Sequence, residues 1–152
     1  MSIKFSRDLI KGRITEVIFE QMMREEGNYT VIPFGYEHTV PTIAQYQDST
    51  ARDILDNIAD TPDFVLISND KRKIYLVEVK YQRKLNMDYL KKKAKKLSER
   101  WKKPWIFLAT PEKFYCTLCK TILEGGINEL SEKWVKKGRQ KAYLELLNEF
   151  EK

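Results

Sequence analysis

The segment Thr61-Pro62-Asp63-Phe64-Val65-Leu66-Ile67, followed after a polar link by Ile74-Tyr75-Leu76-Val77-Glu78-Val79-Lys80, predicts the centre of the fold. Both apolar runs are short and rich in β-branched and aromatic residues, which is typical of strands. The link over residues 68–73 is polar and turn-like, so the two strands are expected to form an antiparallel hairpin. Because the second run is apolar on both faces, it is expected to be a central, buried strand.

The register of this hairpin is expected to bring two carboxylates together. With the turn centred in the middle of the link, Asp63 lies opposite Glu78 on one face of the sheet. Cβ atoms of such partners are roughly 5 Å apart, and two carboxylates at this distance repel each other unless a proton or a cation lies between them. The two-residue period of a strand adds Lys80, and then Gln82, to the same face.

A simpler interpretation is that Glu78 and Lys80 form an exposed ion pair at a strand end, worth less than about 1 kcal/mol. Charges on a buried strand are costly, however, unless they are paired or bind a metal. Asp63 supplies a third charged group at the matching register. The sequence therefore favours a metal site with an ammonium group beside it.

The order Pro62-Asp63, fourteen further residues, and Glu78-Val79-Lys80 resembles the signature of the PD-(D/E)xK nuclease superfamily. Upstream, Gly12-Arg13-Ile14-Thr15-Glu16 resembles the G-x-x-x-E motif of the branch that contains the archaeal Holliday-junction resolvases. The resemblance covers residues 8–109. It implies a restriction-endonuclease-like α/β core and magnesium-dependent hydrolysis of phosphodiester bonds.

The resemblance also implies a metal site. Asp63 and Glu78 would hold Mg²⁺, with the carbonyl group of Val79 beside them, and Mn²⁺ is expected to substitute. Oxygen ligands in octahedral geometry are the ones that magnesium prefers. The ion would polarise a phosphate oxygen and lower the pKa of a bound water.

Three further residues receive catalytic roles from the same resemblance. Lys80 would orient the attacking water and offset the negative charge that grows on the phosphate. Glu16 would hold a water or a second ion, with Glu20 as the substitute candidate. Gln82 would steady the nucleophile or the scissile phosphate.

A helix over residues 7–26 is expected to carry Glu16, and Gly27-Asn28 supplies its stop signal. Its expected buried face comprises Ile10, Ile14, Val17, Ile18 and Met22. Glu16 lies at the edge of this face, and the alternative interpretation makes it an exposed carboxylate paired with a neighbouring arginine.

The first core strand is expected over residues 29–34, and an insertion follows over residues 37–60. A helix is expected within the insertion, starting at Asp48 or Ser49. His38, the single histidine of the chain, is more often structural than catalytic in such a setting, and it receives no assigned role.

Residues 87–103 predict a basic amphipathic helix. Its expected buried face comprises Met87, Leu90, Ala94, Leu97 and Trp101. Residues 91–103 carry eight Lys and Arg residues against one acidic residue, a net charge of +7, whereas the whole chain carries +6. A solvated outer face is one interpretation; the concentration of charge favours a surface that follows a phosphate backbone. The candidate nucleic-acid-binding residues are Lys91, Lys92, Lys95, Lys96 and Arg100.

Residues 105–109 are expected to be the fourth core strand, which gives the order α-β-β-β-α-β. An extra strand is expected over residues 114–119, followed by a closing helix. Cys116 and Cys119 would point to opposite faces of that strand, so core thiols are favoured over a metal site. Tyr143, Leu146, Leu147 and Phe150 share one face of the closing helix, for docking on the core or on a second copy, which makes a homodimer a candidate assembly.

Length and composition are consistent with one domain over residues 1–152 and exclude a disordered chain, since 42% of the residues are hydrophobic. No apolar run approaches the ~18 residues of a membrane span. The charged N-terminus does not resemble a signal peptide, and with two cysteines it favours a cytoplasmic location. The net charge of +6 favours an anionic partner.

The expected function is therefore a metal-dependent endonuclease that hydrolyses phosphodiester bonds of DNA in repair, recombination or defence. Because no separate base-reading domain is evident, structure-selective or weakly sequence-specific cleavage is expected. Two alternatives stay open: a catalytically inactive nucleic-acid-binding or scaffold domain of the same fold, and an RNA nuclease. The joint presence of Asp63, Glu78 and Lys80 argues against loss of catalysis.

Overall fold

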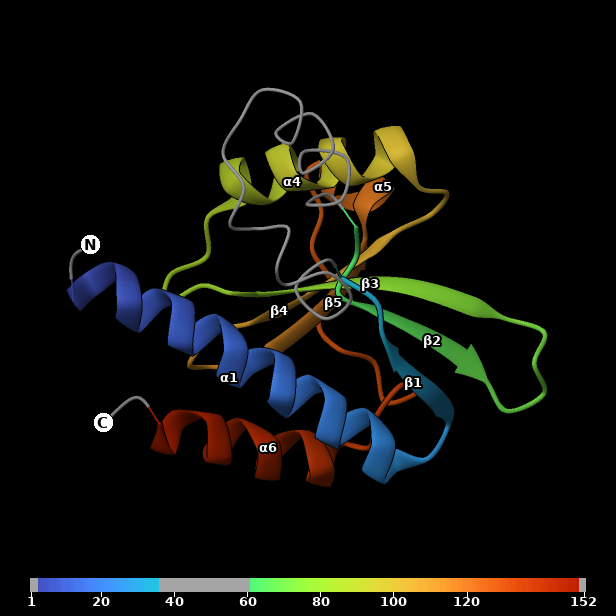
Figure 1. Ribbon diagram of the computed structural model, residues 1–152, viewed down its shortest axis with the longest axis horizontal. Helices are drawn as coiled ribbons and strands as arrows, with labels where there is room; N and C mark the ends of the chain where they lie inside the picture. Colours follow the sequence, from blue (N-terminus) through green and yellow to red (C-terminus); the bar gives the residue numbers. More distant parts are fainter. Residues whose placement is uncertain (1–2, 36–60, 151–152) are drawn as a thin grey trace, which may run out of the picture.

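A five-stranded mixed sheet lies between two layers of helices in the computed structural model, which describes residues 3–35 and 61–150, the side chain of Phe5 excepted (Figure 1). The predicted helix within 37–60 and His38 lie outside these residues. The described elements are α1 (Ile3–Glu26), β1 (Tyr29–Pro33), β2 (Phe64–Ser68), β3 (Ile74–Tyr81), α4 (Met87–Arg100), β4 (Trp105–Ala109), β5 (Phe114–Leu118), α5 (Cys119–Leu123) and α6 (Lys137–Glu149).

The strands lie side by side in chain order, from β1 to β5, so β3 is the central strand as predicted. β3 and β4 are parallel, and the other neighbouring pairs are antiparallel. A parallel pair needs a long crossover, and α4 supplies it. The expected α/β class and the expected order of described elements from α1 to β4 are both confirmed.

The predicted hairpin register is also confirmed: Ile67 pairs with Ile74, and Phe64 pairs with Val77. The link is held by its own side chains, because Asp70 Oδ1 accepts hydrogen bonds from the Ser68 hydroxyl group at 2.6 Å and from the backbone N–H of Arg72 at 3.0 Å. A one-residue slip would turn every β2 side chain to the other face, so this turn decides where Asp63 lies.

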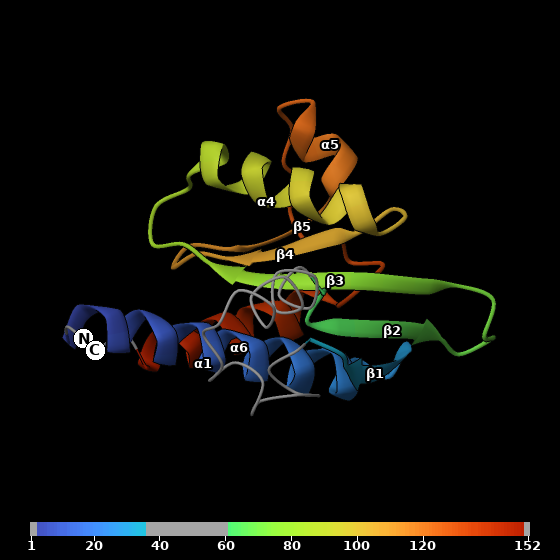
Figure 2. The same cartoon turned by 45° about the horizontal axis from the view of Figure 1, so that its top comes forward.

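Each face of the sheet has its own hydrophobic core, with α1 and α6 covering one face and α4 and α5 the other (Figure 2). Phe19 of α1 contacts Phe64 and Phe107, with ring centroids 5.2 and 4.8 Å apart. Val77 and Val79 belong to this same α1-side core. Because side chains alternate along a strand, Glu78 and Lys80 point toward the α4 side.

The basic helix begins at the predicted residue, but it ends at Arg100, three residues before the predicted end, and Trp101 is its C-cap. Asn86 is its N-cap and accepts a hydrogen bond from the backbone N–H of Tyr89 at 3.1 Å. Leu90, Ala94 and Leu97 are fully buried. These contacts fix the rotation of α4 on the sheet, and therefore which of its lysines can approach the central strand.

The predicted buried face of α1 is only partly correct. Ile18 and Met22 are buried as expected, but Ile10 and Val17 are exposed. The C-terminal half of α1 packs on the sheet through Ile18, Phe19, Met22 and Met23, whereas Ile10 and Val17 border a groove that runs toward α6. The face that a long helix buries therefore changes along its length, because its two halves have different neighbours.

The end of the chain differs from the prediction in one element. Cys119 begins the short helix α5 and does not end β5. Cys116 and Cys119 nevertheless belong to the cores on opposite faces of the sheet, as the core-thiol interpretation requires. Burial raises the pKa of both thiols to about 12, so both stay neutral at physiological pH.

α6 docks on the rest of the molecule through the fully buried Leu147, which belongs to the α1-side core. Across the described residues, no helix combines the length and the apolar character that crossing a membrane requires.

Candidate functional site

Asp63 lies directly before β2 and is held from both sides. Its backbone carbonyl accepts hydrogen bonds from the N–H groups of Phe34 at 2.8 Å and Gly35 at 3.2 Å. Its carboxylate oxygen Oδ2 accepts a third from the N–H of Val79 at 2.8 Å. The chain segment after β1 and the strand β3 thus fix both the backbone and the side chain of this residue.

Glu78 directly follows Val77, the last residue of β3 that pairs with β2, and is 4% exposed. Its oxygen Oε2 has two ammonium partners, Lys93 Nζ at 3.1 Å and Lys80 Nζ at 3.5 Å. Its other oxygen, Oε1, is buried and has no hydrogen-bond partner among the residues that the structure describes. A buried carboxylate oxygen in this state is costly, and a cation or a water would satisfy it.

The carboxylate of Glu78 affects the titration of Asp63. Burial raises the pKa of Asp63 well above its ordinary value, and the nearby carboxylates of Glu78 and Glu16 raise it further. The backbone N–H of Val79 acts in the opposite direction. Asp63 therefore favours a proton or a nearby cation, in keeping with the proximity to Glu78 that the hairpin register predicts.

Lys80 stays charged beside them. Burial acts to lower its pKa, but the carboxylate of Glu78, the hydroxyl group of Tyr89 and the carboxylate of Asp63 together raise it above its ordinary value. Its Nζ also lies 6.0 Å from the centre of the Tyr89 ring. The side chain is 27% exposed, so this ammonium group can reach a ligand.

Asp63 and Lys80 open into a cleft of about 820 Å³ between the N-terminal half of α1, the end of β3 and the start of α4, whereas the buried Glu78 is not part of its described lining. Glu16, Asp63, Val79, Lys80 and Tyr89 are among the residues that line it. The lining also contains four basic residues that the sequence did not single out: Arg7, Lys11, Arg13 and Arg83. No local pattern distinguishes them from other surface basic residues, since only the packing of α1 brings three of them to the cleft.

The structure separates the two acidic candidates on α1. Glu16 is 8% exposed, lines the cleft and contributes to the raised pKa of Asp63. Glu20 instead forms an ion pair with Arg24 at 2.8 Å, on the same helix. Of these two candidates, Glu16 is therefore the one that lies at the site, where Asp8 of α1 also lines the cleft.

Gln82 does not join this group. β3 ends at Tyr81, and the side-chain amide of Gln82 bonds with the backbone of Asn86, accepting at 2.9 Å and donating at 3.3 Å. It is absent from the described lining of the cleft. Its observed contacts brace the loop that leads into α4.

The basic helix reaches the site through a residue that the sequence did not select. Lys91, Lys92, Lys95, Lys96 and Arg100 are exposed, and none of these five is part of the described lining of the cleft. Lys93 instead reaches Glu78. The sequence spacing could have predicted this position. Lys93 is three residues after Leu90 and four before Leu97, so it lies at the edge of the buried face.

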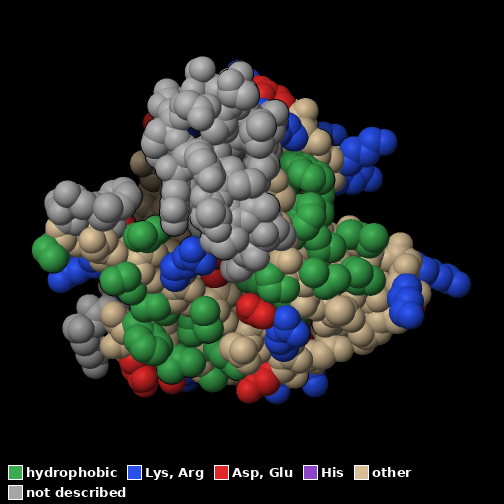
Figure 3. Space-filling view, viewed as in Figure 1, with side chains coloured by type: hydrophobic (Ala, Val, Ile, Leu, Met, Phe, Trp, Pro, Cys, Tyr) green, Lys and Arg blue, Asp and Glu red, His purple; other side chains and the backbone are tan. Residues whose placement is uncertain are grey.

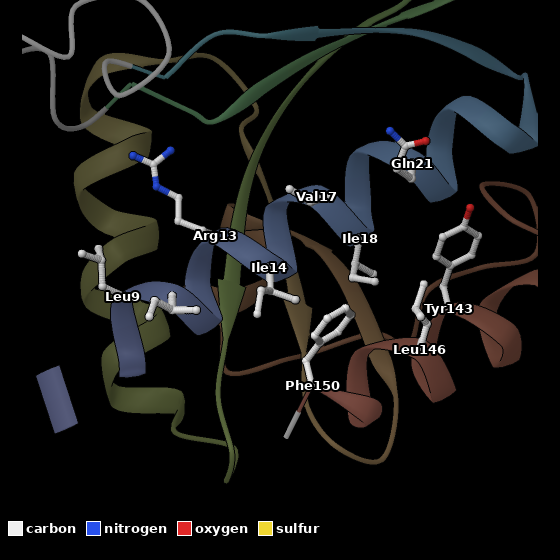
Figure 4. A pocket seen from close by; sticks show the side chains of 10 residues that line it. Leu9, Arg13, Ile14, Val17, Ile18, Gln21, Tyr143, Leu146 and Phe150 are labelled. Atoms are coloured by element: carbon white, nitrogen blue, oxygen red, sulfur yellow. The ribbon is translucent and has the colours of Figure 1, made fainter. Parts of the chain in front are cut away.

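An apolar groove of about 530 Å³ adjoins the cleft between α1 and α6 (Figure 4). Ile14, Ile18, Leu146 and Phe150 line it, and Figure 3 shows hydrophobic side chains gathered over these two helices. The groove shares five lining residues with the cleft: Leu9, Ile10, Arg13, Ile14 and Phe150. A second copy of the chain as the partner of α6 stays a prediction.

The donor set suits a hard divalent cation. Asp63 and Glu78 offer carboxylate oxygens, and Glu78 Oε1 is unsatisfied among the described residues. No group of three or more His, Cys, Asp and Glu side chains in that part of the chain gathers closely enough to be a ready-made metal cluster. A metal would therefore rest on two protein carboxylates and waters, which is how magnesium is commonly bound.

No protein-family model matches this sequence, and comparison with curated proteins gives no significant match.

Proposed function

We propose that this protein is a metal-dependent nuclease of the PD-(D/E)xK type, with a restriction-endonuclease-like core, which hydrolyses phosphodiester bonds of DNA. The observation that carries the proposal is that Asp63 and Lys80 line one cleft, and that the buried Glu78, which pairs with Lys80, has an oxygen Oε1 without a hydrogen-bond partner among the described residues. The mixed sheet and the order from α1 to β4 support the same class.

Asp63 and Glu78 would hold Mg²⁺ or Mn²⁺, with the Val79 carbonyl as a further candidate ligand. When bound, the ion supplies Lewis acidity and a water of lowered pKa. Lys80 lines the cleft and places a positive charge where a scissile phosphate would gain negative charge. Glu16 faces the same space and would orient a water through its carboxylate.

The basic residues of the cleft supply binding. Arg7, Lys11 and Arg13 come from α1, and Arg83 follows β3. Such groups bind phosphates without reading bases. The proposal therefore includes structure-selective or weakly sequence-specific cleavage.

Incubation of the purified protein with labelled duplex, single-stranded and branched DNA, and with RNA, tests the proposal, each with and without Mg²⁺ or Mn²⁺. We expect metal-dependent cleavage of at least one DNA. Asp63→Ala and Glu78→Ala should abolish it, and Lys80→Ala should lower turnover by about 10²-fold. Absence of cleavage with either metal, or alanine variants as active as the parent, would refute the nuclease.

A nucleic-acid-binding domain without catalysis is the second candidate, and one observation favours it. Glu78 already has two ammonium partners, Lys80 and Lys93, which balance its charge without a metal. In that case Mg²⁺ should leave the melting temperature unchanged. A functional site binds the ion in the folded state only and therefore raises the melting temperature.

A further inference from the structure

Lys93 has a position that its neighbours on the basic helix do not share. Its Nζ lies 3.1 Å from Glu78 Oε2, closer than Lys80 Nζ at 3.5 Å. The Lys93 side chain is 16% exposed and the Lys80 side chain 27%. A lysine that is this buried loses hydration and conformational freedom, so its ion pair with Glu78 must be specific to hold it there.

The two lysines differ in what else they face. Lys80 is part of the lining of the cleft, and Lys93 is absent from that lining as far as the structure describes it. Lys93 therefore supplies a counter-charge to Glu78 from α4, on a side where it does not face the cleft.

Lys93 is also anchored by a well-packed element. Leu90, Ala94 and Leu97 fix α4 on the sheet and are fully buried. The ammonium group of Lys93 therefore comes from a helix whose rotation against the sheet is fixed by packing. Lys80 instead comes from near the end of β3, beside the open cleft. This arrangement suits an outer residue that orients a metal ligand.

We propose that Lys93 is a positioning residue for the metal site: it binds Glu78 Oε2, presents Oε1 to the cation, and leaves Lys80 to act on the substrate. This inference rests on the proposed function. If Lys93 were lost, the Lys80 ammonium group would become the sole positive partner that the structure shows for Glu78, and the carboxylate would turn toward it. Metal affinity would then fall.

A metal titration that involves no nucleic acid tests this role. Free Mn²⁺ is measured by electron paramagnetic resonance for the parent, Lys93→Met, Lys93→Arg and the matched control Lys92→Met, an exposed neighbour on the same helix. We expect Lys93→Met to raise the Kd for Mn²⁺ about tenfold or more, the effect of removing other residues that orient a metal ligand. Lys93→Arg should restore most of the affinity, and Lys92→Met should not change it.

Cleavage then separates the two lysines. At saturating Mn²⁺, Lys93→Met should return to within a few-fold of the parent turnover, because its defect is in metal binding. Lys80→Met should stay about 10²-fold slower at any metal concentration. Circular dichroism checks the fold, and Lys93→Gln, which keeps a hydrogen-bond donor, replaces Lys93→Met if that variant does not fold.

An unchanged or lower Kd for Mn²⁺ in Lys93→Met would overturn the inference. An unchanged Kd would mean that Lys93 has no effect on metal binding, and a lower Kd would mean that Lys93 competes with the cation for Glu78. If the parent binds Mn²⁺ but cleaves no nucleic acid, the proposed nuclease fails while the Mn²⁺ titration still decides the role of Lys93. If the parent binds no Mn²⁺, both proposals fail.

Discussion

The carboxylate of Asp63 is expected to lower the stability of the metal-free protein and to favour binding of a cation. Burial, Glu78 and Glu16 all raise its pKa, and the N–H of Val79 only partly offsets them. The ionised form is therefore strained in the absence of a cation. A site that costs stability when empty gains the most when a cation binds.

Asp63→Asn should make the metal-free protein more stable at neutral pH. Because the folded-state pKa lies above the ordinary value of 3.8, the native state binds more protons than the unfolded state between these two values. The free energy of unfolding of the parent should then fall as pH rises through this window, and the variant, whose amide keeps an acceptor for the Val79 N–H, should escape that loss.

Urea unfolding in EDTA at pH 4.5 and pH 7.5 measures this difference. The advantage of Asp63→Asn should be larger at pH 7.5 and should shrink toward pH 4.5. A variant that is less stable than the parent at pH 7.5 would show that the Asp63 carboxylate is not strained.

Gly35 sets the space around the same residue. A Cβ atom at Gly35 would lie 3.3 Å from both the Cα and the Oδ1 atoms of Asp63. The Asp63 backbone is hydrogen bonded and cannot easily move, so Gly35→Ala should cost about 1–3 kcal/mol of stability. We also expect weaker Mn²⁺ binding, measured by titration, because the Asp63 carboxylate would be displaced.

Gly138→Ala is the matched control. No heavy atom lies within 4 Å of a Cβ added at Gly138. Gly138 is in helix α6, where alanine stabilises the helix by up to about 1 kcal/mol relative to glycine. The control should be neutral or more stable, with unchanged Mn²⁺ affinity. If Gly35→Ala has the same stability and the same Mn²⁺ affinity as Gly138→Ala, Asp63 can move without cost and the prediction is wrong.

At the scale of elements, the basic residues of α4 lie on two sides of the helix, although the sequence analysis predicted a single basic surface. Tyr89, Lys93, Lys96 and Arg100 follow the spacing i, i+4, i+7 and i+11, so they share the side of the helix that holds the cleft-lining Tyr89 and the ion pair to Glu78. Lys91 and Lys95 lie on the opposite side by the same geometry. On the first side, Tyr89 lines the cleft and Lys93 pairs with Glu78, whereas Lys96 and Arg100 continue that side beyond the described lining of the cleft.

Two double variants with the same change in net charge test whether this side binds a phosphate backbone. Lys96→Glu with Arg100→Glu should weaken duplex DNA binding and flatten its log–log salt dependence by about one unit for each phosphate that is no longer neutralised. Lys91→Glu with Lys95→Glu should change affinity much less. Affinities measured between about 50 and 300 mM salt, a range in which the Debye length passes through about 8 Å, provide the readout. Equal effects would mean that only total charge matters.

At the scale of the whole molecule, two cores share one sheet. The α1-side core contains Phe19, Phe64 and Phe107, and the α4-side core contains Leu90, Leu97 and Ile106. Neighbouring residues of β4 contribute to opposite cores, so neither layer can detach without exposing the other face of the same strand. The described residues should therefore unfold as one cooperative unit.

Single-tryptophan variants test this cooperativity. Trp101 packs against the α4-side core, and Trp134 packs against the α1-side core. Each variant keeps one of these two tryptophans, and Phe replaces the other tryptophans of the chain. Within each variant, the urea midpoint measured by fluorescence should equal the midpoint measured by circular dichroism. Separate transitions within one variant, by the two probes, would instead indicate two domains.

Much of the fold and part of the site followed from local sequence. The length of the 68–73 link and the alternation of the strands were enough to predict that Asp63 lies opposite Glu78, because pairing and alternation depend on residues close in the chain. The start of α4 at Met87 and its buried residues Leu90, Ala94 and Leu97 were predicted for the same reason. The nuclease itself stays a prediction that cleavage assays must test.

The tertiary structure decided what lies around those residues. It directed Lys93 to Glu78, brought the basic residues of α1 to the cleft, bound Gln82 to the backbone of Asn86, and left Ile10 and Val17 exposed. Each outcome depends on how a helix is rotated and shifted against distant strands. Helical periodicity specifies which residues share a face, but the packing of whole side-chain layers determines what that face meets.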